Sequence, residues 1–247
     1  MADSDLYSMI IKQRENRQKR DLRPFNNFIN KFWRSEKLLK AVTKSIKDKE
    51  CLNEALYHMV ISDCTAFEIY FKDIFTVMFK MCDNQKELLI KFNKKLDNRK
   101  FDIEDLVKVK YENFEVYEII AGNQNFQNLK SINKFFSIVL DKDFCDGFNN
   151  RIFQTVVQKT IPFTLPDDWY PKIQRYLDLR HNLIHDFNPQ LKLNKKNIEK
   201  LHSNLSIFIV AADIYLHEDY IEPNLKDEFK KSSVSSSKNK IKKSVKK

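Results

Sequence analysis

The sequence has very little glycine: Gly122 and Gly147 are the only two glycines among its 247 residues. Six prolines are spread thinly along the chain. Because the tight turns of β-sheets rely on glycine, this scarcity argues against a β-rich fold. Hydrophobic residues make up 42% of the chain and include 20 phenylalanines, which is enough for a core between long helices. We therefore predict an all-α protein, an up-and-down helical bundle.

The sequence also has no long apolar run and no clustered cysteines. No window approaches the roughly 18–20 apolar residues of a membrane span, and we expect no signal peptide. Cys51, Cys64, Cys82 and Cys145 lack CxxC or zinc-ligand spacing, so we expect four reduced structural thiols. These features predict a soluble, cytoplasmic protein with no membrane partner and with no metal or other cofactor.

The positive charge is concentrated at the two ends of the chain. Residues 226–247 hold nine lysines against two acidic residues, a net charge of +7, and residues 1–23 carry +2 of the total of +10. We predict a charged N-terminal lead-in over 1–23, a helical domain over 24–222 and a flexible, disordered Lys/Ser-rich tail over 223–247. The tail either binds nucleic acid without sequence preference or only keeps the protein soluble.

Apolar residues recur at helical spacing in most of the chain. A single apolar stripe marks the longest predicted helix and consists of Leu56, Val60, Cys64, Phe67, Phe71, Ile74 and Met78. We predict helices over about 25–46, 50–82 and 171–187, a last helix capped by Asn194, and broken helices over 86–158. The stretch TIPFTLPDDWYP (160–171) is interpreted as a loop.

The helix predicted over 171–187 carries the stretch LRHNLIHDFNP, which includes Arg180. On an ideal helical wheel Arg180 lies in the middle of the apolar face. An arginine keeps its charge, so at such a position it must meet an anion. Asp63 and Glu68 of the long helix could supply a carboxylate, with Asp63 fitting slightly better by angle. A bound phosphate could supply the anion instead.

His185 lies about 140° from Arg180 on an ideal helix, so the two residues do not share a face. One interpretation is a solvated histidine at a helix end, where the helix dipole favours its charged form. The other brings His185 close to an Arg180, either by unwinding of the helix before Pro189 or through a symmetric dimer.

The two histidines of this helix have the spacing of paired metal ligands. His181 and His185 stand at i and i+4, but Asn182 occupies the position where the HExxH pattern needs glutamate. Nothing in the sequence marks His202 or His217 as an inward-pointing third ligand. A zinc hydrolase is therefore not expected.

The pattern from Arg180 to His185, R-polar-x3-H, resembles the signature of the HEPN family, helical domains that are often metal-independent ribonucleases. Two other stretches resemble the RiboL-PSP branch of that family: HMVISDCTAFEIYFKDIF (58–75), with Ser62, Glu68 and Tyr70, and AGNQNFQNLKSINKFF (121–136), with Phe126 to Leu129. The resemblance covers roughly residues 50–215. The chain departs from the family at His181, because the family often has asparagine or aspartate directly after the arginine.

The resemblance implies a helical bundle that is usually dimeric, with two copies of the motif facing each other across one RNA-binding cleft. It implies that Arg180 holds the scissile phosphate and that His185 moves protons while the RNA 2′-hydroxyl attacks. His181 and Asn182 would orient the phosphate or His185. Family members often act in bacterial toxin–antitoxin or anti-phage defence, so an antitoxin or defence-system protein is an expected partner.

Two alternatives stay open. A non-catalytic HEPN-like module that binds a protein or nucleotide would keep Arg180 paired with Asp63 or Glu68 and would lack an open cleft. A nucleic-acid-binding protein that acts through its tail alone would lose binding when residues 226–247 are removed. In that case a change of Arg180 would only destabilise the fold.

Overall fold

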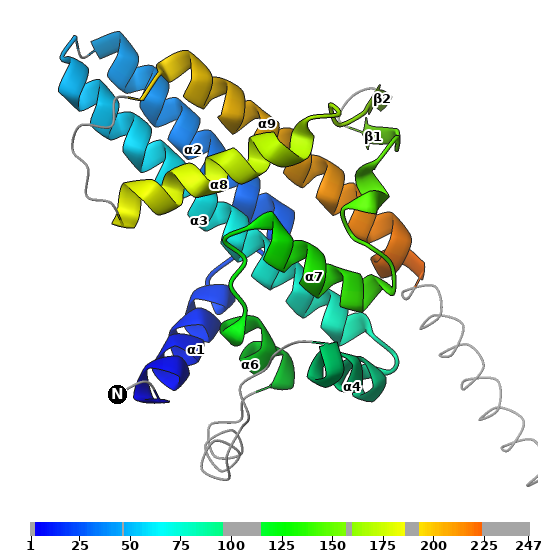
Figure 1. The fold of residues 1–247 in the computed structure, drawn as a ribbon. Helices are drawn as coiled ribbons and strands as arrows, with labels where there is room; N and C mark the ends of the chain where they lie inside the picture. Colours follow the sequence, from blue (N-terminus) through cyan, green and yellow to red (C-terminus); the bar gives the residue numbers. More distant parts are fainter. Residues whose placement is uncertain (1–2, 46, 96–114, 157–159, 186–192, 224–247) are drawn as a thin grey trace, which may run out of the picture.

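The computed structural model describes residues 3–45, 47–95, 115–156, 160–185 and 193–223, which are helical apart from one small hairpin (Figure 1). The helices are α1 (Asp3–Gln18), α2 (Pro24–Ser45), α3 (Lys49–Met81), α4 (Gln85–Lys95), α6 (Val116–Asn123), α7 (Leu129–Leu140), α8 (Trp169–His185) and α9 (Lys195–Leu216). A 3-10 turn covers Asp146–Phe148, and a π-helical turn covers His217–Ile221 after α9. The all-α prediction is confirmed, and the predicted bounds of α2, α3 and α8 lie within two residues of the observed ones.

The central element is α3, which has 33 residues and is therefore about 50 Å long. Asp48 caps its N-terminus, because the carboxylate accepts hydrogen bonds from the backbone N–H groups of Glu50 at 2.7 Å and Cys51 at 3.0 Å. Figure 1 shows α2 and α9 lying along α3, while α8 crosses α3 obliquely. This crossing brings Tyr176 of α8 to Asp63 of α3.

Aromatic rings fill the space between these helices. Phe75 of α3 meets Phe135 of α7 edge to face, with ring centroids 4.7 Å apart and an interplanar angle of 79°. Trp169, the first residue of α8, stacks on Phe208 of α9 at 5.1 Å and 11°. Such pairs add to the free energy gained by burying their large apolar surfaces. The Trp169–Phe208 pair fixes the N-terminal end of α8 against α9.

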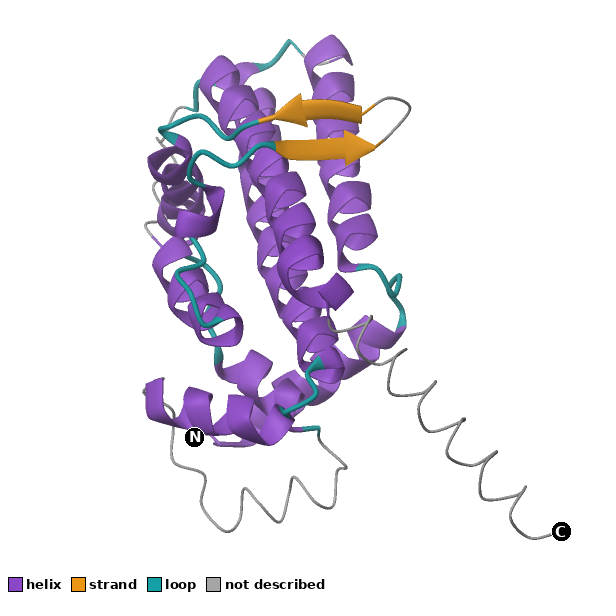
Figure 2. Cartoon of the chain, turned by 90° about the vertical axis from the view of Figure 1, so that its right-hand side faces the viewer, coloured by secondary structure: helices purple, strands orange, loops and turns teal. Residues whose placement is uncertain are grey.

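A short antiparallel hairpin, β1 (Phe153–Val156) and β2 (Thr160–Phe163), lies beside α9 (Figure 2). The prediction of a loop over 160–171 is wrong for the residues of β2, and the prediction of broken helices over 86–158 is wrong for the residues of β1. The sequence feature that could have indicated strands is the β-branched residues of this region, which favour strands. Pro162 is tolerated because both strands of a two-stranded sheet are edges. Phe153 is buried and pairs with the ring of Phe163 at 5.5 Å, which attaches the hairpin to the core.

The two glycines stand where another segment approaches the backbone closely. A Cβ atom at Gly147 would collide with the ring of Tyr215 of α9, and one at Gly122 would lie 3.0 Å from the side chain of Ile10 of α1. A larger residue at position 147 therefore has no space, whereas at position 122 it would require a small shift of the Ile10 side chain.

The N-terminal lead-in forms α1 and belongs to the folded part. Arg14 donates from Nε to Glu118 Oε1 at 3.0 Å, and Arg20 donates to Asp73 Oδ1 at 2.7 Å. Arg17 lies between them, 3.5 Å from Asp73 and 3.4 Å from Glu118. Burial raises the pKa of Glu118, but the hydrogen bonds from Arg14 and from the backbone outweigh it, so its pKa is lowered. These ion pairs hold α1 against α3 and α6.

Replacing Glu118 by glutamine should loosen α1, because Arg14 and Arg17 lose the charge that they face. A hydrogen bond to a charged group contributes about 1.5–3 kcal/mol, so amide exchange within residues 8–18 should rise at least about tenfold. Hydrogen–deuterium exchange measures this. The control is Glu36→Gln, which removes only a surface pair with Lys40 and should leave exchange unchanged. Equal exchange in α1 of the two variants would contradict the role of Glu118.

Several sequence predictions concern residues outside these ranges. Residues 224–247, which include nearly all of the predicted tail, are not among the described residues.

Within the described ranges, no helix is both long and apolar enough to cross a membrane. The four cysteines are free, and the buried Cys64 donates a weak hydrogen bond to the carbonyl of Tyr176 at 3.7 Å.

Candidate functional site

A buried carboxylate joins three helices where α8 crosses α3. Asp63 of α3 is 0% exposed. Its Oδ2 accepts a hydrogen bond from the hydroxyl of Tyr176 of α8 at 2.8 Å and lies 2.7 Å from Nδ1 of His202 of α9. The His202 ring also stacks on Phe32 of α2, with centroids 3.6 Å apart. One carboxylate oxygen therefore fixes the position of α8 and α9 on α3.

The burial of His202 was not predicted from the sequence, in which nothing marked it as pointing inward. The sequence feature that could have indicated its burial is its position four residues after Ile198 and three before Leu205, both of which are buried. A histidine in an apolar stripe needs a polar partner, and Asp63 in the stripe of α3 supplies it.

Replacing Asp63 by alanine should lower the free energy of unfolding by about 3 kcal/mol or more, because Tyr176 and His202 lose their shared acceptor in the interior. Urea denaturation measures the loss. The matched control is Asp178→Ala at an exposed position of α8, which should change stability by less than about 0.5 kcal/mol. If the two variants were equally stable, Asp63 would not fix the helices.

The other candidate carboxylate, Glu68, links two of the stretches that resemble the HEPN family. Its Oε1 lies 3.0 Å from Nζ of Lys72, and its Oε2 accepts a hydrogen bond from Gln127 at 3.2 Å. The backbone N–H of Leu129, two residues later, donates to Gln174 of α8 at 3.0 Å. The stretches 58–75 and 121–136 and the helix that carries RHNLIH thus meet in space.

Arg180 lies one turn after Tyr176 and is partly buried. Burial raises the pKa of the Cys64 thiol; the charge of Asp63 adds to this rise and the charge of Arg180 opposes it. Its Nε is buried without a hydrogen-bond partner. Within the described residues, Arg180 forms an ion pair with neither Asp63 nor Glu68, which bond to other groups. The expected pairing with one of these carboxylates is therefore not found.

The remaining site residues lie at the C-terminal end of α8. His181 and Asn182 are exposed. His185 is the last residue of the helix, and its side chain is not among those described. Unwinding before Pro189 concerns residues 186–192, which also lie outside the described ranges. Chemically, the described part offers a partly exposed guanidinium without a carboxylate partner beside two exposed polar side chains, an arrangement that can bind an anion.

Neither a metal-ligand cluster in the described residues nor a similar known protein was found. No group of three or more His, Cys, Asp or Glu side chains is placed to hold a metal ion in the part of the chain that the structure covers. Comparisons of the chain with protein-family models, curated protein sequences and solved structures found nothing similar. The resemblance to the HEPN family therefore rests on the residues of the chain itself.

Proposed function

We propose that this protein is a metal-independent endoribonuclease of the HEPN type, in which Arg180 holds the scissile phosphate. The observation that carries the proposal is the guanidinium of Arg180, which is partly buried and has no carboxylate partner among the described residues. An arginine cannot lose its charge, so an anion stabilises it at a partly buried position. A phosphodiester matches the planar, forked donors of a guanidinium.

The chemistry needs no nucleophile from the protein. The 2′-oxygen of the RNA forms a bond to the adjacent phosphorus, and the bond from phosphorus to the 5′-oxygen breaks. His185 moves the proton that the 2′-hydroxyl loses and the leaving 5′-oxygen gains. Arg180 stabilises the negative charge that develops on the phosphate oxygens. The products are a 2′,3′-cyclic phosphate and a 5′-hydroxyl, and DNA is resistant because it lacks the 2′-hydroxyl.

The contacts between the three HEPN-like stretches support the proposal. Glu68 binds Gln127, and Leu129 binds Gln174 of α8, so residues far apart in the sequence surround one region. A non-catalytic module would favour a permanently paired Arg180, and the described residues give no such pair. Cleavage of cellular RNA suits a toxin of a toxin–antitoxin pair or an anti-phage effector, with an antitoxin or defence-system protein as partner.

The wild-type protein should cleave a mixed RNA pool in excess EDTA, and Arg180→Ala and His185→Ala should each lower the rate at least about 100-fold. The matched control is Arg34→Ala, which removes an exposed arginine of α2 and should cleave at the wild-type rate. Circular dichroism should show that all variants are folded. Mass spectrometry of the fragments should find 2′,3′-cyclic phosphate ends. Equal activity of the Arg180→Ala and Arg34→Ala variants would sink the assignment of Arg180.

We further propose that the active protein is a homodimer. Positions 180 and 185 lie about 140° apart on α8, which separates them within one helix. A symmetric dimer that places His185 of one protomer beside Arg180 of the other would complete two equivalent sites.

Mixing the Arg180→Ala and His185→Ala variants should then restore activity. A heterodimer of the two would hold one site with both residues intact, so random exchange of protomers should give about a quarter of the wild-type rate. The measurement is RNA cleavage after the variants are unfolded and refolded together. Each variant refolded alone is the control. No gain on mixing, with heterodimers detected by native mass spectrometry, would show that Arg180 and His185 of the same protomer act together.

A further inference from the structure

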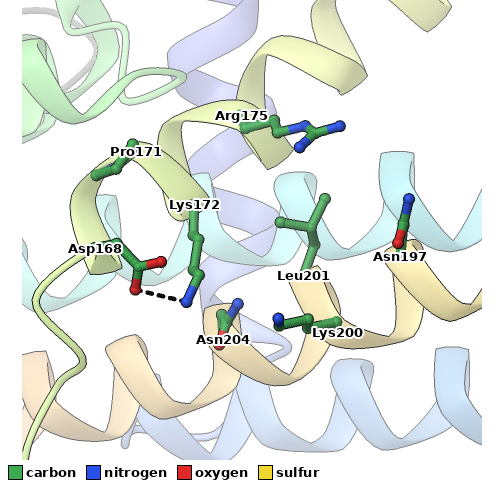
Figure 3. Close-up of a pocket in the computed structure, with 8 residues that line it drawn as sticks. All are labelled: Asp168, Pro171, Lys172, Arg175, Asn197, Lys200, Leu201 and Asn204. Atoms are coloured by element: carbon green, nitrogen blue, oxygen red, sulfur yellow. Dashed lines mark hydrogen bonds and ion pairs between the residues drawn. The ribbon is translucent and has the colours of Figure 1, made fainter.

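A basic groove lies between α8 and α9, away from the apolar face of α8 that packs on α3 (Figure 3). It has a volume of about 340 Å³. The side chains that line it are Asp168, Pro171, Lys172, Arg175, Asn197, Lys200, Leu201 and Asn204. Three of them are basic and one is acidic, which gives the groove a net charge of +2.

Two of the basic groups are available to a ligand. Lys172 is neutralised by Asp168, which accepts its hydrogen bond at 2.5 Å. The pKa of Asp168 is lowered mainly by this hydrogen bond from Lys172, and to a smaller extent by the charge of Lys200. Arg175 and Lys200 are exposed, and no carboxylate of the described residues forms an ion pair with either. Each therefore presents a full positive charge to the groove.

Asn204 adds a donor that the fold leaves unused. Its Nδ2 is buried and has no hydrogen-bond partner among the described residues, although the side chain lines the groove. Buried donors are almost always satisfied, so this amide group is free to donate to water or to an acceptor that a ligand brings into the groove. Donors from Asn204, Arg175 and Lys200 together select an anion with several acceptor oxygens, which a phosphate group provides.

The outer face of α8 connects this groove with the end of the helix that carries the proposed catalytic residues. Arg175 and Asn182 are seven residues apart, so they lie within about 20° of each other around the helix and about 10.5 Å apart along its axis. Both are exposed. A strand with one phosphate in the groove can therefore run along α8 toward Asn182.

We propose that the groove between α8 and α9 binds a backbone phosphate of the RNA substrate, one that flanks the cleaved phosphodiester. The inference rests on the proposed ribonuclease function, since it assigns the ligand to the same substrate strand. Arg175 and Lys200 hold the phosphate by charge, and Asn204 donates an amide hydrogen bond to one of its oxygens. The groove contributes to affinity and register and touches no reacting atom.

The test is the salt dependence of binding to a fluorescein-labelled 2′-O-methyl RNA 12-mer, which cannot be cleaved by attack of a 2′-hydroxyl. Each lost phosphate contact to a single strand lowers the slope of log K against log salt by about 0.7. The full-length Arg175→Gln/Lys200→Gln variant loses the one phosphate contact of the groove, so the magnitude of its slope should fall by about 0.7, and that of Lys200→Gln alone by a part of this. Fluorescence anisotropy at several salt concentrations gives the slopes.

The matched control is Lys86→Gln/Lys94→Gln, which removes the same charge from exposed positions of α4, a helix far from the groove in Figure 1. Its slope should equal that of the wild type. An equal slope for the Arg175→Gln/Lys200→Gln variant would overturn the proposal. If 5′-AMP bound the wild type as tightly as the 12-mer does and lost this affinity in the variant, the ligand would be a free phosphate compound, and the assignment to RNA would be wrong.

Cleavage of ordinary RNA by the same proteins separates this inference from the proposed function. Groove-dependent binding by a wild type that does not cleave would support the groove and refute the ribonuclease. If the wild type cleaved RNA but the groove variants bound RNA with the wild-type salt dependence, the ribonuclease would be supported and the groove proposal refuted. A wild type that binds no RNA would overturn both.

Discussion

The arrangement of the site depends on the buried carboxylate of Asp63. A carboxylate removed from water is costly unless it is hydrogen-bonded, and here the hydroxyl of Tyr176 and the ring of His202 meet the same oxygen. Neither α8 nor α9 can slide or rotate on α3 without breaking one of these bonds. The axial position of α8 is therefore fixed at Tyr176. Arg180 follows one turn later on the same helix.

This geometry also explains why Arg180 has no partner in the described part of the chain. Because α8 crosses α3 obliquely (Figure 1), it meets Asp63 through the turn that holds Tyr176. Glu68 is bound by Lys72 and Gln127. The Nε of Arg180 lacks a hydrogen-bond partner, as do several other buried polar atoms of the fold, among them Nε of Arg17 and of Arg20. Arg180 differs from these two arginines because they pair with Asp73, whereas Arg180 has no carboxylate partner among the described residues, and this supports a bound anion.

The sequence predicted the helices well, because their signals are local. Apolar periodicity gave the bounds of α2, α3 and α8, and Asn194 caps α9 by accepting the N–H of Asn197 at 3.1 Å, as expected. The helical wheel placed Asp63 and Arg180 on facing surfaces, but it gives only the angle around each axis. Which residues meet depends on the crossing point of two helices, and this is a tertiary property. For the same reason the partner of His202 could not be assigned.

The two arginines of α8 illustrate how one helix can divide the tasks of substrate binding. Arg180 is partly buried, whereas Arg175 is exposed at the groove with α9. Salt and water screen exposed charges strongly and buried charges weakly. Under the proposed function, the groove would attract and align the strand, and Arg180 would act on the phosphate that reacts. Binding energy gained away from the reacting atoms can then position them. Because Tyr176 stands between the two arginines and is fixed to Asp63, the relative position of both phosphate sites would be set by the core.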